Sequence, residues 1–124
     1  MIRLVAVDLP GGPGFVDALN RVWNDGDAVF VIDRRLPADA RRQLLRVVRP
    51  HAIIGESGRS SPRHNPIAPA LEPGDALVVA TSGSTGAPKV IVHTREGLDG
   101  QARAVHARLG VEPGRDRWLA CLPL

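Results

Sequence analysis

The first 54 residues alternate short apolar runs with segments of helical periodicity. Three runs, residues 2–7, 28–32 and 51–54, have the length and the β-branched content of strands. Between them, residues 15–24 and 38–48 repeat apolar side chains at helical spacing. An order of strand, helix, strand, helix, strand is typical of βαβ units. The pattern therefore predicts an α/β fold with a mostly parallel sheet flanked by helices.

Each predicted helix has one apolar face that can pack against this sheet. The glycine of Asn24-Asp25-Gly26-Asp27 is expected to end the first helix, and Pro50 the second. The inward positions are Phe15, Leu19, Val22 and Trp23 in the first helix, and Ala40, Leu44, Leu45 and Val48 in the second.

Composition excludes several classes of protein. No apolar run approaches the about 18 residues that a transmembrane helix needs, so we expect no membrane partner. The net charge is +3, but the arginines are scattered and aromatic residues are few, which argues against a nucleic-acid partner. The single cysteine, Cys121, rules out an internal disulfide framework and suits the cytoplasm. Because Cys121 lies in the apolar run 118–122, we expect it to be buried.

The second half of the chain has a different pattern. Residues 55–73 contain four prolines and three serines and are expected to form a loop, with a turn at its Gly-x-x-Gly start. Residues 76–80 and 89–92 read as strands, and 118–122 as a last strand. Between the strands 89–92 and 118–122, a helix is expected that Thr94 can cap and Gly110 can end. The apolar stripe of that helix is Leu98, Ala102, Val105 and Leu109.

A stretch rich in glycine and hydroxyl groups separates the strands 76–80 and 89–92. Successive N–H groups in such a turn can form a nest for an anion, and Lys89 is the single lysine among 16 basic side chains. The spacing differs from that of a Walker loop, and a strand follows in place of a helix. The alternative is an ordinary polar hairpin loop. The candidate phosphate-binding residues are Thr81, Ser82, Gly83, Ser84, Thr85, Gly86 and Lys89.

Two histidines are candidate ligand groups. His93 follows the strand that leaves the loop, and either a ligand contact or a plain strand-to-helix junction fits its position. His106 lies one residue from the apolar stripe and is expected to be a partly exposed helix residue.

The stretch Thr-Ser-Gly-Ser-Thr-Gly-Ala-Pro-Lys at 81–89 resembles the phosphate-loop signature of the AMP-forming adenylating enzymes. It departs from that signature at Val90, where the family usually has glycine. The resemblance covers residues 76–98 closely and the rest loosely, and the Leu-Pro near the end of the chain also fits. It is most like the short ligases of the o-succinylbenzoate–CoA ligase type. The implied fold is an incomplete N-terminal AMP-binding domain, with a βαβαβ segment at 1–54, a loop at 55–74 and a phosphate-loop segment at 75–124.

The resemblance implies ATP-dependent adenylation of a carboxylic acid, followed by thioester formation with coenzyme A. ATP, Mg²⁺ and coenzyme A are then the implied cofactors, and a small carboxylic acid the implied partner. It implies no catalytic residue within 124 residues, so we expect the chain alone to be inactive. The alternative is a small non-catalytic α/β module that binds an anion or nucleotide; a third possibility is another nucleotide enzyme with an unfamiliar loop.

Overall fold

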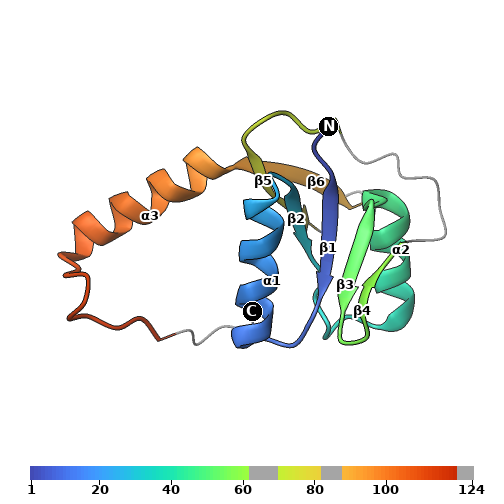
Figure 1. Cartoon of the computed structure of the whole chain (residues 1–124), viewed down its shortest axis with the longest axis horizontal. Helices are drawn as coiled ribbons and strands as arrows, with labels where there is room; N and C mark the ends of the chain where they lie inside the picture. Colours follow the sequence, from blue (N-terminus) through green and yellow to red (C-terminus); the bar gives the residue numbers. More distant parts are fainter. Residues whose placement is uncertain (62–69, 82–87, 120–124) are drawn as a thin grey trace.

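The computed structural model describes residues 1–61, 70–81 and 88–119 (Figure 1). Its helices are α1 (Pro13–Asn24), α2 (Ala38–Val48) and α3 (Arg95–Leu109). Its strands are β1 (Leu4–Asp8), β2 (Ala28–Val31), β3 (Ala52–Gly55), β4 (Gly58–Ser60), β5 (Asp75–Thr81) and β6 (Lys89–Thr94).

The strands form one mixed sheet in the order β4-β3-β1-β2-β5-β6. β1 pairs in parallel with β2 and β3, and β2 pairs in parallel with β5. The two edge pairs, β3–β4 and β5–β6, are antiparallel. The α/β fold class and the mostly parallel sheet predicted from the strand–helix alternation are therefore confirmed.

The two crossover helices cover opposite faces of this sheet. α1 carries the chain from β1 to its neighbour β2, whereas α2 carries it back past β1 to β3. Because such crossovers are right-handed, connections that run in opposite directions place their helices on opposite faces. The chain therefore moves across the sheet in one direction from β1 to β2 and in the opposite direction from β2 to β3.

Two apolar clusters, one on each face, confirm this arrangement. β1 is buried on both sides, and its side chains alternate between the clusters, as expected for a central parallel strand. The cluster on the α1 side contains Val5, Val7, Phe15, Ala18, Val22, Val29 and Ala52. The cluster on the α2 side contains Leu4, Ala6, Ala28, Phe30, Ile32, Val48 and Val78.

Helix boundaries follow local chemistry. α1 begins at Pro13, two residues before the predicted start, because proline is favoured at the first helical position. The Thr94 hydroxyl caps α3 by accepting a hydrogen bond from the Gly97 N–H at 3.1 Å. Gly110 ends α3 in the left-handed region at φ 63°. Both predicted caps of α3 are thus confirmed.

Two predictions of secondary structure were wrong. The segment expected to be only a loop contains β4, which forms a hairpin with β3 around the predicted turn at Glu56 and Ser57. Trp118 and Leu119, expected to begin a strand, are not in one. The rest of that predicted strand, with Cys121, lies outside the described residues.

α3 differs from α1 and α2 in its surroundings. It extends away from the sheet from the end of β6 (Figure 1), and none of its residues is buried. Val105 and Leu109 on its apolar stripe are 40% and 63% exposed. Among the helices of the described ranges, none has the length and apolar character needed to cross a membrane.

Candidate functional site

The β5–β6 hairpin carries the predicted phosphate-binding stretch. Its antiparallel ladder runs to the pair Thr81–Lys89. Directly opposed residues of two antiparallel strands project on the same face of the sheet, with Cβ atoms about 5 Å apart. The hairpin therefore brings the Thr81 hydroxyl and the Lys89 ammonium to one face, and both residues are exposed there.

The loop between these two residues lies outside the described residues. The structure therefore places two of the predicted site residues, Thr81 and Lys89, side by side. It makes no statement on the other five, Ser82, Gly83, Ser84, Thr85 and Gly86. The chain after Lys89 continues as a strand, which confirms that a helix of the Walker type does not follow the loop.

The position of β5 in the sheet puts the hairpin end at the edge where α/β proteins bind ligands. β5 is parallel to β2, so Thr81 lies at the same edge as Asp33, which follows β2. In open α/β sheets, ligands bind outside the carboxyl ends of the strands. The candidate site thus lies where this fold class favours one.

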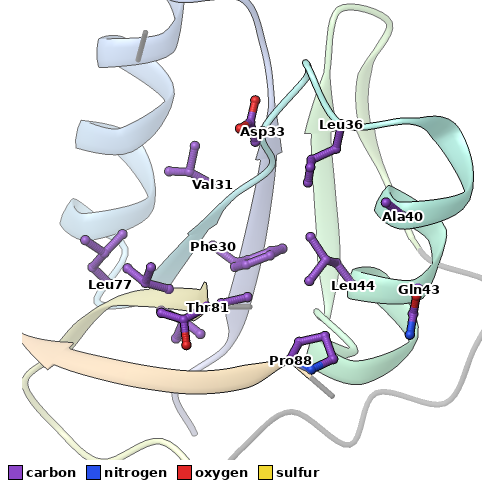
Figure 2. A pocket seen from close by; sticks show the side chains of 13 residues that line it. Phe30, Val31, Asp33, Leu36, Ala40, Gln43, Leu44, Leu77, Thr81 and Pro88 are labelled. Atoms are coloured by element: carbon purple, nitrogen blue, oxygen red, sulfur yellow. The ribbon is translucent and has the colours of Figure 1, made fainter. Parts of the chain in front are cut away.

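A cavity of about 640 Å³ adjoins the hairpin end. Its volume falls within the range of about 300–1,000 Å³ that small-molecule sites have. In Figure 2 the side chains of Phe30 and Leu44 point toward one another across it. Apolar residues from β2, α2 and β5 form most of its wall, and Thr81 and Pro88 border the phosphate-loop stretch. The lining residues are Phe30, Val31, Asp33, Leu36, Ala40, Gln43, Leu44, Leu77, Val78, Val79, Ala80, Thr81 and Pro88.

The carboxylate at this cavity is held by a neighbouring arginine. Asp33 accepts hydrogen bonds from Nε and Nη2 of Arg35 at 2.9 and 2.7 Å and from the Arg35 backbone N–H at 3.0 Å. These bonds to the Arg35 side chain and backbone lower the pKa of Asp33 from 3.8 to about 2. The Asp33 carboxylate is therefore negatively charged at neutral pH and is already paired with Arg35.

A second ionic group lies at the carboxyl ends of β1 and β3. The Arg34 guanidinium lies 2.7 Å from the Glu56 carboxylate and 3.4 Å from that of Asp8. The hydrogen bond to Glu56 raises the pKa of Arg34. Arg41 on α2 also approaches Asp8, at 3.8 Å. Since these charges neutralise one another, we interpret the group as a brace between the strand ends.

The two histidines lie away from Thr81 and Lys89. His93 is exposed and pairs with Leu77, toward the open end of the hairpin. His106 is exposed on α3 and stacks on Trp118, with ring centroids 5.6 Å apart. His106 therefore lies on a helix, as predicted, and is exposed.

The cavity was not predicted from the sequence. Its walls come from three elements that are distant in the sequence, and no local pattern showed that β5 would pair with β2. Within residues 1–61, 70–81 and 88–119, no cluster of three His, Cys, Asp or Glu residues could hold a metal ion.

The fold matches part of known adenylate-forming enzymes. An o-succinylbenzoate CoA synthetase (MenE) from Bacillus subtilis, solved with the acyl-adenylate intermediate OSB-AMP, superposes with a TM-score of 0.77 at 20% identity. The match covers 98% of this chain and 37% of that enzyme. A variant of MenE from E. coli, with bound OSB-AMS, has a TM-score of 0.73 at 22% identity over 99% of this chain and 30% of its own. The class that the fold defines is thus an α/β domain similar to one segment of these enzymes.

Sequence comparisons agree with this class. A Salinispora arenicola protein described as "Probable non-canonical nonribosomal peptide synthetase (NRPS) CymA" is 36% identical over 111 residues, which cover 88% of this chain and 1% of the relative. A Humulus lupulus protein described as "Probable CoA ligase CCL8" is 36% identical over 74 residues, 60% of this chain and 12% of the relative. No model of a known protein family matches the chain. By sequence and fold together, the chain is similar to one segment of the AMP-forming adenylating enzymes. It spans only a small part of the length of these relatives.

Proposed function

We propose that the protein carrying this chain activates a carboxylic acid with ATP and then transfers the acyl group to coenzyme A. The carboxylate would attack the α-phosphorus of ATP and expel pyrophosphate, and the thiol of coenzyme A would then displace AMP. The relatives support this reaction class, since they are described as a CoA synthetase and a probable CoA ligase. The chain would contribute the part that holds the ATP phosphates.

The observation that carries the proposal is the pairing of Thr81 with Lys89 across the end of the β5–β6 hairpin. Phosphoryl chemistry needs positioning and offset of negative charge more than covalent help from the protein. Lys89 would supply the positive charge, and the Thr81 hydroxyl a hydrogen bond on the same face. Ser82, Gly83, Ser84, Thr85 and Gly86 would complete the phosphate contacts through hydroxyl and backbone N–H groups. Mg²⁺ would enter bound to ATP.

The direct test is exchange of labelled pyrophosphate into ATP by the full-length protein. Exchange that depends on an added carboxylic acid supports adenylation, and subsequent release of AMP on addition of coenzyme A supports thioester formation. The test uses a panel of aliphatic and aromatic carboxylic acids. If the folded protein binds ATP but shows no exchange with any acid of the panel, the alternative of a non-catalytic nucleotide-binding module is supported.

A further inference from the structure

An aromatic and a cationic side chain are in contact where α3 joins the sheet and α1. The guanidinium carbon of Arg95, the first residue of α3, lies 4.7 Å from the centroid of the Trp23 ring near the end of α1. An arginine over the face of tryptophan is a favourable cation–π contact. The two residues are 72 positions apart in the sequence, and the contact links α1 to the start of α3.

Both residues also donate hydrogen bonds to the backbone at the start of β5, Trp23 within the strand and Arg95 to the residue before it. The indole Nε1–H of Trp23 donates a hydrogen bond to the carbonyl oxygen of Ala76 at 2.8 Å. The backbone N–H of Arg95 donates to the carbonyl oxygen of Gly74 at 2.8 Å. Trp23 and Arg95 therefore hydrogen-bond the open end of the β5–β6 hairpin, which is opposite the end that carries Thr81 and Lys89.

The hairpin has an irregularity at the point where Trp23 binds it. Its ladder passes from the pair Asp75–Thr94 to the pair Leu77–His93, so that Ala76 has no partner in β6. An extra residue of this kind is a β-bulge, which shifts the register of all the pairs beyond it. Ala76 is 2% exposed, and its carbonyl oxygen would lose this hydrogen bond without the Trp23 indole.

Register decides which side chains share a face of the hairpin. A slip of one residue turns every side chain of a strand to the other face. Such a slip would move Lys89 from its place opposite Thr81. We infer that Trp23 and Arg95 are positioning residues, which hold the bulge at Ala76 and so keep Lys89 opposite Thr81 in the phosphate site. This inference rests on the proposed function only for its consequence in ATP binding.

Three variants of the full-length protein test the inference. Trp23→Phe keeps a ring beneath Arg95 but removes the Nε1–H donor, and Arg95→Gln removes the charge. We expect each to raise the KM for ATP about threefold to tenfold, the range that loss of one such interaction produces. The KM for the carboxylic acid should not change, whereas a general loss of structure would alter both. Arg95→Lys, which keeps a cation over Trp23, should restore most of the ATP affinity.

Arg103→Gln is the matched control, since Arg103 is an exposed arginine of α3 with no ion pair among the described residues. Register itself is measured by NMR, through interstrand nuclear Overhauser contacts between Val79 and Ile91, which are partners in the ladder. In Trp23→Phe these contacts should weaken, and contacts of Val79 with Val90 or Val92 should grow. An unchanged contact pattern together with an unchanged KM for ATP would overturn the inference. If the parent protein shows no use of ATP, the proposed function fails, and the NMR measurement alone still decides the role of Trp23.

Discussion

Thr81 and Lys89 form the pair nearest the loop in the β5–β6 ladder, although eight positions separate them in the sequence. The antiparallel pairing brings the lone lysine of the chain to the same face as the threonine that opens the Gly/Ser stretch. This arrangement needs no helix after the loop. It places a positive charge and a hydroxyl at the carboxyl end of β5, next to the cavity between β2, β5 and α2.

A buried carboxylate ties the starts of the two central strands together. Asp27 is 5% exposed and accepts hydrogen bonds from the backbone N–H of Arg3 at 2.9 Å and from its Nε at 3.1 Å. We expect Asp27→Ala to lower the free energy of unfolding by about 1–3 kcal/mol, because it removes the acceptor of both groups. Urea denaturation measures the loss. Asp17→Ala, which truncates an exposed acid on α1, is the control, and an equal loss in both variants would contradict the prediction.

The ion pair of Asp33 and Arg35 predicts a dependence of stability on pH. The pKa of Asp33 is about 2 in the folded chain, below its ordinary value of 3.8, owing to its hydrogen bonds with Arg35. A carboxylate with a lowered pKa contributes stability above its unfolded pKa and loses it as pH falls through its folded pKa. The melting temperature of the parent should therefore drop between about pH 4 and pH 2 more steeply than that of Asp33→Asn. Parallel profiles for the two proteins would show that the pair adds nothing.

The exposed apolar surfaces predict that the 124-residue chain associates with itself when isolated. Among the described strands, β6 lies at an edge of the sheet with Ile91 45% exposed, and the stripe on α3 exposes Val105 and Leu109. Unpaired edges and apolar patches of this kind bind other chains. Sedimentation velocity should show oligomers that Leu109→Glu reduces and Arg103→Glu does not. A monomer at all concentrations, with cooperative melting, would favour the alternative of a complete small module.

Much of the fold could be predicted because local and tertiary preferences agree. The strand at residues 28–32 is a continuous apolar run, and it is buried on both faces as β2. The boundaries of α2 match the predicted helix 38–48, which Pro50 follows. β4 could not be predicted, since Gly-Arg-Ser has no strand pattern and becomes a strand only by pairing with β3. The bond from Trp23 to Ala76 joins residues 53 positions apart, and nothing in the sequence around either residue indicates it.

The candidate site was predictable in part for the same reason. The Gly/Ser stretch and Lys89 stand out in the sequence, and the strands on both sides of them form the hairpin. The cavity depends on which strands become neighbours in the sheet. The parallel pairing of β2 with β5 cannot be recognised in the sequence of either strand. The roles of the residues between Thr81 and Lys89 remain predictions from the motif.

The central claim is that the β5–β6 hairpin holds the phosphates of ATP, and Lys89 tests it most directly. Lys89 is exposed, so Lys89→Ala should leave the fold and the melting temperature intact. The measurement is carboxylic-acid-dependent exchange of pyrophosphate into ATP by the full-length parent and by Lys89→Ala, with Arg103→Ala as the control. The account predicts a rate at least about tenfold lower for Lys89→Ala, since interactions with charged groups are worth about 1.5–3 kcal/mol, and no change for the control. Equal exchange rates in the parent and in Lys89→Ala would contradict it.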